Sequence, residues 1–188
     1  SPPGRLSGRA AAWGIVSLLA GLSILWQVVT MQRWDADWRF KANIWRAVMD
    51  AAPGLEPGTV MVLLVPDDGS PLPAALRGTG FITPMGRILY HDPSLIVENI
   101  GRSAQVNSEI VFEEDGVILN GKHPYDRVLF LQLETYPGDD PDALSVRASA
   151  VECLPEEYAP PSPEHEICGN PGLVTDAELS TPARELLY

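Results

Sequence analysis

The 188-residue sequence lacks the short motifs that mark most nucleotide-dependent and hydrolytic enzymes. It contains no Walker loop, no Gly-x-Ser-x-Gly elbow, no His-Glu-x-x-His pair and no dinucleotide-binding glycine fingerprint. It has only three histidines and two cysteines, and no Asn-x-Ser/Thr sequon. We therefore expect no catalytic residue, cofactor or metal site in this chain, and whether the protein is an enzyme stays open.

Positive charge is scarce in most of the chain. Residues 53–188 hold seven basic and 22 acidic side chains, a net charge of −15, whereas residues 1–52 carry a net charge of +3. A domain this acidic repels phosphates, which excludes nucleic acid as a partner. A basic segment beside an acidic domain suits attraction to anionic lipid on one side and solubility on the other.

The N-terminal part contains one long uncharged run, residues 10–30, preceded by a short flank, residues 1–9. At ~1.5 Å per residue, a helix of this length spans roughly 30 Å, the thickness of a bilayer's hydrocarbon core. Trp13 and Trp26 lie toward opposite ends of the run, where indole rings favour the membrane interface. The run is too long for a signal peptide, and a buried soluble helix of this length would usually have a polar face. The sequence therefore predicts a transmembrane helix at 10–30, with the lipid bilayer as its partner.

A second helical stretch, residues 31–52, is predicted directly after the membrane segment. Its apolar stripe repeats with helical spacing and consists of Met31, Trp34, Trp38, Ala42, Trp45 and Met49. Arg39 and Arg46 flank the stripe, which suits an amphipathic helix lying among lipid headgroups. Packing of the same tryptophans against the soluble domain is the alternative, and we expect a mixture of the two. Pro53-Gly54 should end this helix.

The residues around this helix carry a resemblance to a known group of proteins. The pattern is Trp34-(x3)-Trp38-(x6)-Trp45-(x7)-Pro53-Gly54-Leu55-(x)-Pro57-Gly58-Thr59, running into the apolar strand 60–65. It resembles a juncture in large, uncharacterised multi-spanning bacterial membrane proteins, some of which are similar to polytopic glycosyltransferases that use lipid-linked sugars. There, a last membrane helix leads through a Trp-rich helix into a soluble domain outside the cytoplasm.

The resemblance also implies a late Cys-Leu dipeptide, and Cys153-Leu154 would correspond to it. The residues that follow, Pro155-Glu-Glu-Tyr158, depart from the family pattern, so the resemblance covers residues 31–65.

Residues 57–152 are predicted to form a small β-rich domain. Apolar or alternating runs predict strands at 59–65, 94–100, 109–112, 117–119, 127–134 and 143–151. Residues 80–90 are expected to form a β-hairpin turning at Pro84-Met85-Gly86, and Asn120-Gly121 is expected as a second hairpin turn. Strands at this spacing favour a mainly antiparallel sheet or sandwich, so the expected fold class is α+β. Residues 153–188 are expected to form a proline-rich tail with a short helix within 175–187.

The redox state of the two cysteines, Cys153 and Cys168, would indicate on which side of the membrane the soluble domain lies. A disulfide between them would contribute roughly 3 kcal/mol on the chain-entropy model and would require an oxidising compartment. Two free thiols in a cytoplasmic domain are the alternative. The positive-inside rule points to the cytoplasm, since Arg5 and Arg9 precede the membrane segment and four basic residues follow it. The resemblance points outside, and we expect an extracytoplasmic domain at the cell membrane.

The remaining chemistry-bearing residues favour ordinary surface roles. His91, His123 and His165 lie in predicted turns or in the tail without the spacing of a metal site. The acidic clusters at 67–68, 113–115 and 139–142 lack the spacing of a calcium loop, and solvated turns are expected there.

One stretch, residues 78–91, is similar to the first hairpin of trypsin-like proteases. The late segment Cys168-Gly-Asn-Pro-Gly172 has no serine nucleophile, so the protease interpretation fails.

Three functions remain as hypotheses. The first is a non-catalytic accessory or interaction domain at the C-terminus of a polytopic bacterial envelope protein, with upstream membrane helices of the same protein as partners. The chain begins with Ser1 rather than Met, so we expect it to be processed, truncated or a fragment, and we treat it as the end of a longer protein. The second is the terminal part of a glycosyltransferase-like enzyme whose catalytic residues lie upstream. The third is a single-pass anchored binding domain.

Overall fold

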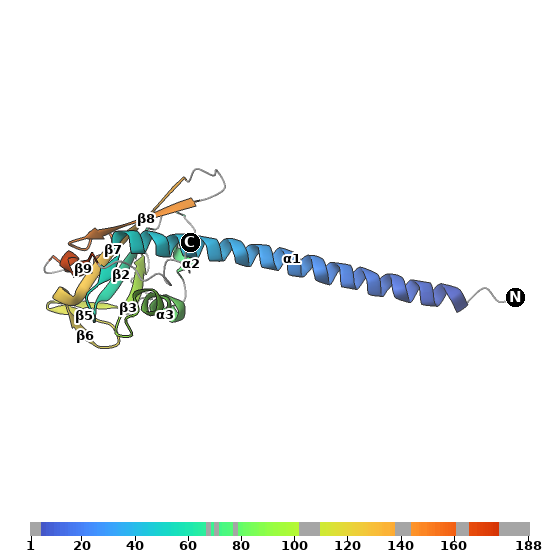
Figure 1. Ribbon diagram of the computed structural model, residues 1–188, viewed down its shortest axis with the longest axis horizontal. Helices are drawn as coiled ribbons and strands as arrows, with labels where there is room; N and C mark the ends of the chain where they lie inside the picture. The colour runs from blue at the N-terminus through green and yellow to red at the C-terminus, as the bar shows by residue number, and fades with distance from the viewer. Residues whose placement is uncertain are drawn as a thin grey trace. The chain divides into compact units, whose positions relative to one another are not determined.

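The computed structural model describes residues 5–66, 69, 72–76, 79–101, 110–137, 144–160 and 166–176 (Figure 1). The chain divides into two compact units, residues 1–39 and residues 40–188. The first unit is helical. The second is an α+β domain, which confirms the expected fold class.

One helix, α1 (Arg5–Ala51), replaces the two predicted helices and runs without interruption through the stretches 10–30 and 31–52. It ends one residue before Ala52, as the Pro53-Gly54 pair predicts. The hydroxyl of Tyr90 donates a hydrogen bond to the carbonyl oxygen of Ala52 at 2.7 Å, which satisfies an acceptor at the helix end. Burial raises the pKa of Tyr90, so the hydroxyl keeps its proton.

The main sheet of the second unit has the strand order β3-β2-β7-β8 (Figure 1). Its strands are β2 (Val60–Val65), β3 (Ile96–Gly101), β7 (Val128–Pro137) and β8 (Leu144–Val151). β2 pairs in parallel with β3 and with β7, whereas β7 and β8 form an antiparallel pair. Four of the six strand pairings in the described residues are antiparallel, but the centre of the largest sheet is parallel.

The predicted hairpin at 80–90 is wrong, because these residues form the helix α3 (Thr79–Tyr90) with Pro84 inside it. Ile82, Met85 and Leu89 are buried at positions i, i+3 and i+7, which is helical spacing. A parallel pair such as β2 and β3 needs a long crossover, and α3, preceded by the short helix α2 (Leu72–Ala75), provides it. A Cβ on Gly86 would approach the Val97 side chain at 2.7 Å, so glycine here permits close packing of α3 on β3.

The main sheet separates two hydrophobic cores. In β2, β3 and β7, residues of odd number such as Met61 and Leu129 face the first core with α3 and the last turns of α1, whereas in β8 the even-numbered Val146 does so. In the same three strands, residues of even number such as Val62 and Phe130 face the second core, which includes the small sheet and the C-terminal segment. The continuous burial of β2 on both faces explains its run of apolar residues, Val-Met-Val-Leu-Leu-Val.

The small sheet is an antiparallel meander of β4 (Val111–Glu113), β5 (Gly116–Ile118) and β6 (Lys122–Pro124), followed by the 3-10 turn η2 (Tyr125–Arg127). The predicted turn at Asn120-Gly121 is confirmed, because β5 and β6 pair across it and both residues have positive φ angles. The other predicted strands are confirmed to within a few residues of their ends.

The C-terminal segment is more ordered than the predicted tail. Leu154, Tyr158 and Ile167 are buried in the second core. The 3-10 turn η3 (Pro171–Leu173) leads into β9 (Val174–Thr175), which pairs with β1 (Gly54–Leu55). Thr175 is therefore a strand residue rather than the start of the predicted helix at 175–187, and residues 177–188 lie outside the described residues.

Candidate membrane-anchoring segment

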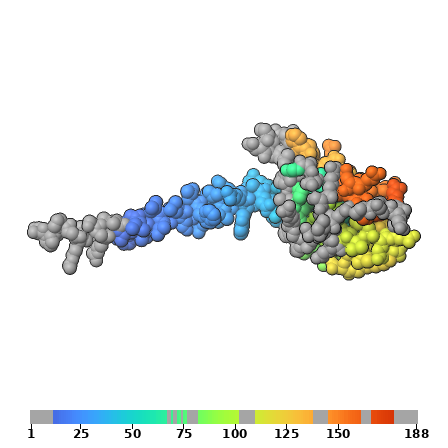
Figure 2. Space-filling view, turned by 180° about the vertical axis from the view of Figure 1, so that it is seen from behind, coloured from blue at the N-terminus to red at the C-terminus, as the bar shows by residue number. Residues whose placement is uncertain are grey.

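The first unit has an apolar surface that is exposed in the described part of the chain. Between residues 12 and 39, every described residue except Thr30 is exposed, including large side chains such as Trp13 and Trp26, each 72% exposed. The side chains of this stretch are drawn in blue in Figure 2. One helical stretch of the described residues is long and apolar enough to cross a membrane. An isolated helix of this composition in water would expose far more apolar surface than soluble proteins tolerate, so this surface needs an apolar environment.

The backbone of this stretch is helical throughout, and one of its hydroxyl groups bonds to the helix itself. The hydroxyl of Thr30 donates a hydrogen bond to the carbonyl oxygen of Trp26, one turn earlier, at 2.8 Å. Hydrocarbon offers no hydrogen-bond partner, so a hydroxyl that bonds to its own helix is compatible with a position in lipid.

The end of the apolar run is followed by aromatic and charged side chains. Trp34 is 76% exposed and Trp38 is 46% exposed, one helical turn apart. Arg39 forms an ion pair with Asp35 at 2.8 Å, and both side chains are well exposed. Exposed tryptophans with arginine beside them fit the headgroup region of a membrane, where indole rings and guanidinium groups are favoured.

Two residues predicted at the membrane interface belong to the folded domain. Trp45 is only 2% exposed and packs in the first core, so its interface assignment is corrected to core packing. Arg46 is partly buried and donates a hydrogen bond to the Asn43 side chain at 2.9 Å. Of the two expected roles, packing against the domain is therefore confirmed for Trp45, whereas Trp34 and Trp38 are exposed and their position among lipid headgroups stays a prediction.

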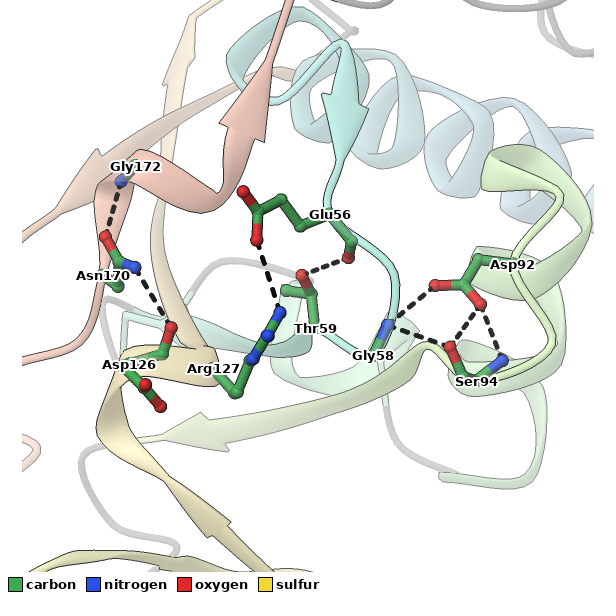
Figure 3. A network of polar contacts seen from close by, with 9 residues as sticks. All are labelled: Glu56, Gly58, Thr59, Asp92, Ser94, Asp126, Arg127, Asn170 and Gly172. Atoms are coloured by element: carbon green, nitrogen blue, oxygen red, sulfur yellow. Dashed lines mark hydrogen bonds and ion pairs between the residues drawn. The ribbon is translucent and has the colours of Figure 1, made fainter.

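A polar network joins three loops of the second unit (Figure 3). These loops precede β2, β3 and β7, and they lie at the amino-terminal edge of the parallel strands. Arg127 contacts the Glu56 carboxylate at 3.3 Å, and Asn170 donates a hydrogen bond to the carbonyl oxygen of Asp126 at 3.1 Å. Ligands of parallel α/β sheets bind at the opposite, carboxyl edge. The network therefore holds the fold together rather than forming a ligand site.

Asp92 is the most heavily bonded carboxylate of this network. It accepts hydrogen bonds from the Ser94 backbone and hydroxyl and from the Gly58 backbone (Figure 3). Partial burial disfavours its charge, but these bonds and one from the Leu95 backbone outweigh burial and lower the pKa of Asp92. The Asp-Pro-Ser sequence is a signal for such a turn, although sequence reasoning did not use it.

Two of the three histidines, His91 and His123, lie among the described residues, each in or beside a turn of the fold. His91 is exposed and has a φ of +51° just after α3, the conformation that ends many helices. The ring nitrogen Nε2 of His123 lies 3.1 Å from the carbonyl oxygen of Leu119, within the β5–β6 hairpin. His165 lies outside the described residues.

The acidic cluster at 113–115 forms ion pairs with Lys122 of strand β6. Lys122 contacts the carboxylates of Glu113 at 2.8 Å and Asp115 at 2.6 Å. These contacts raise the pKa of Lys122, and the hydrogen bond from Lys122 lowers the pKa of Asp115. The clusters at 67–68 and 139–142 lie outside the described residues.

Cys153 and Cys168 form a disulfide between two neighbouring antiparallel segments. Both cysteines are partly buried, and the exposed Glu166 places its carboxylate within 4.8 Å of their sulfur atoms. Sequence reasoning left the disulfide open and did not connect Glu166 with it. The Glu-x-Cys spacing, which puts two side chains on one side of an extended segment, is the signal that could have done so.

Sequence reasoning also missed Glu98, which is 5% exposed on β3 and faces the second core. Its Oε1 accepts a hydrogen bond from the Asn99 backbone at 3.0 Å. The available signal was a lone carboxylate among the apolar residues of the predicted strand 94–100.

No family model, curated protein or solved structure matches this chain. The fold and the candidate site define it as an α+β domain preceded by a helix with the length and composition of a membrane span.

Proposed function

We propose that this chain is a membrane-anchored accessory or interaction domain, held in the bilayer by the first part of α1. The observation that carries this proposal is the exposed apolar surface of residues 12–31 on an uninterrupted helix. Burying a single large apolar side chain is worth ~2 kcal/mol, so transfer of this stretch into lipid far exceeds the binding energy of a surface helix.

A non-catalytic role for the soluble domain rests on what its polar groups do. Asp92, Glu56 and Arg127 hold loops together, and Lys122 joins two carboxylates of one sheet. Polar groups that make such contacts stabilise the fold, so a partner would bind to other parts of the domain surface. The proposal places this domain at the end of a larger polytopic envelope protein, in line with the resemblance at residues 31–65.

The disulfide supports an extracytoplasmic location for the domain. Cytoplasmic reductants keep most thiol pairs reduced, whereas exported domains keep their disulfides. The count of basic residues beside the span, two before it and four after it, points the other way, so the labelling experiment decides the orientation.

A labelling experiment in intact cells tests both the anchor and its orientation. Treatment with a membrane-impermeant phosphine reductant and then an impermeant maleimide should label Cys153 and Cys168 without lysis. A Ser7→Cys variant in a Cys153→Ser/Cys168→Ser background should be labelled only after lysis, because Ser7 precedes the span. Labelling of Cys153 and Cys168 only in lysed cells would reverse the proposed orientation, and recovery of the chain in the soluble fraction would refute the anchor.

A further inference from the structure

The disulfide region contains the one group of three potential metal ligands found among the described residues. The Sγ atoms of Cys153 and Cys168 and a carboxylate oxygen of Glu166 all lie within 4.8 Å of one another. In the disulfide form the two sulfur atoms are bonded to each other, so they are not available as thiolate ligands.

The backbone holds the two cysteines together independently of their bond. The Leu154 amide donates a hydrogen bond to the Ile167 carbonyl at 2.7 Å, and the Gly169 amide donates one to the Glu152 carbonyl at 2.8 Å. Leu154 and Ile167 are 7% and 4% exposed in the second core, which anchors both segments. Reduction of the disulfide therefore leaves two thiols side by side on a fixed frame.

We propose that the reduced pair, together with Glu166, forms a binding site for a thiophilic divalent cation such as Zn²⁺. Thiolate sulfur and carboxylate oxygen are both established zinc ligands, and three protein ligands leave a fourth position for water. Tetrahedral zinc holds two sulfur atoms about 3.7 Å apart, given Zn–S distances near 2.3 Å. The Cα atoms of the two cysteines are 3.9 Å apart on neighbouring segments, so both thiolates lie within reach of one cation.

The chemistry of the switch balances with a dithiol as reductant. The S–S bond accepts two electrons and two protons from the dithiol, which becomes a disulfide. Binding of the cation then displaces the two thiol protons to solvent, leaving two thiolates and one carboxylate around the metal. The oxidised chain has no such site, so the disulfide controls access to the metal.

Cobalt titration of the full chain in detergent micelles tests this proposal. The fully reduced protein should bind one Co²⁺ and show the near-ultraviolet charge-transfer absorption of thiolate–cobalt bonds. Excess Zn²⁺ should abolish that absorption. The oxidised protein and the Cys153→Ser/Cys168→Ser variant should show none.

A matched pair of variants tests the third ligand. Glu166→Gln should weaken Co²⁺ binding by about tenfold or more, because a ligand is lost. Glu152→Gln removes the same charge one residue from Cys153 and should change the affinity by less than about twofold. Equal affinities for these two variants would exclude Glu166 as a ligand and overturn the three-ligand site. Absence of the charge-transfer absorption in the reduced protein, or loss of its folded circular-dichroism spectrum on reduction alone, would overturn the proposal as a whole.

Discussion

Trp34 and Trp45 lie on the same apolar stripe of α1, but they differ in exposure and belong to different compact units. Trp34 is 76% exposed in the first unit, whereas Trp45 is 2% exposed in the core of the second. The helix is continuous between them, and both positions fit the same helical repeat. One apolar stripe can therefore be exposed in one part of a helix and buried in a protein core in another. The boundary between the two parts lies near Phe40, where the second unit begins.

This comparison moves the boundary of the soluble domain upstream. The last turns of α1 contribute four large buried side chains to the first core, Ile44, Trp45, Val48 and Met49, along with the smaller Ala42 and Ala47. The folded domain therefore starts near Phe40 rather than after Pro53-Gly54. The predictions below test that assignment, beginning with the largest expected effect.

Removal of the last turns of α1 should prevent folding of the domain. Fragment 53–188 loses four large buried side chains, worth on the order of 8 kcal/mol at ~2 kcal/mol each, which is comparable to the whole stability of a typical domain. Fragment 40–188 should give dispersed NMR spectra and a cooperative urea transition, and fragment 53–188 should give neither. A cooperatively folded 53–188 would show that the boundary lies after the helix.

Truncation of the two tryptophans should have unequal effects on stability. Trp45→Ala should lower the free energy of unfolding of the domain by about 3–5 kcal/mol, because it leaves a cavity in the core. Trp34→Ala should change it by less than about 0.5 kcal/mol, since the side chain contacts no core. Pulse proteolysis in urea, applied to the full chain in detergent, measures both. Similar decreases in the free energy of unfolding for the two variants would contradict the assignment of Trp34 and Trp45 to different environments.

Loss of the disulfide should have the next largest effect. Cys153 and Cys168 are 15 residues apart, so the double serine variant should lose about 3 kcal/mol. The domain should remain folded, because the buried Leu154 and Ile167 still hold the segments. Urea denaturation of fragment 40–188 measures the loss, and an unchanged midpoint would show that the bridge does not restrict the unfolded chain.

The smallest expected effect is the pH dependence of Asp92. Its pKa is lower in the folded state than in the unfolded chain, so the carboxylate stabilises the fold above the unfolded pKa, about 3.9. That contribution is lost as the pH falls through the lower, folded pKa. Asp92→Asn should therefore cost up to about 1 kcal/mol at pH 7, with the difference from wild type vanishing in acid.

Asp126→Asn is the control for this titration, because the contact of Asp126 in the network uses its backbone carbonyl. It removes the same charge without removing that contact and should change the free energy of unfolding at pH 7 by less than about 0.5 kcal/mol. A constant difference between Asp92→Asn and wild type from pH 7 to pH 3 would contradict the assignment.

Sequence reasoning predicted the parts of the fold whose signals are local. The uncharged run at 10–30, the helix end before Pro53, the apolar strand β2 and the turn at Asn120-Gly121 all have their own physical causes in neighbouring residues. These features need no knowledge of the rest of the chain.

The errors come from features that depend on distant segments. Pro84 and Gly86 resemble turn residues, but in the structure Gly86 allows α3 to approach Val97, and Pro84 lies on the exposed side of the helix. Because the periodicity of Ile82, Met85 and Leu89 spans only two turns, it was outweighed by the turn signal. The parallel pairing of β2 follows from this helix, so missing the helix also meant missing the topology. The difference in burial between Trp45 and Trp34 could not be predicted from the helical repeat either, because it depends on which part of the stripe packs against the rest of the second unit.

Vesicle flotation tests the central claim most directly, because it compares the two parts of α1 in one assay. The full chain, reconstituted with vesicles of phosphatidylcholine and phosphatidylglycerol, should float with them and resist an alkaline wash. Fragment 40–188, which keeps Trp45 but lacks residues 1–39, should remain at the bottom of the gradient. Flotation of the fragment, or release of the full chain by the wash, would contradict the account.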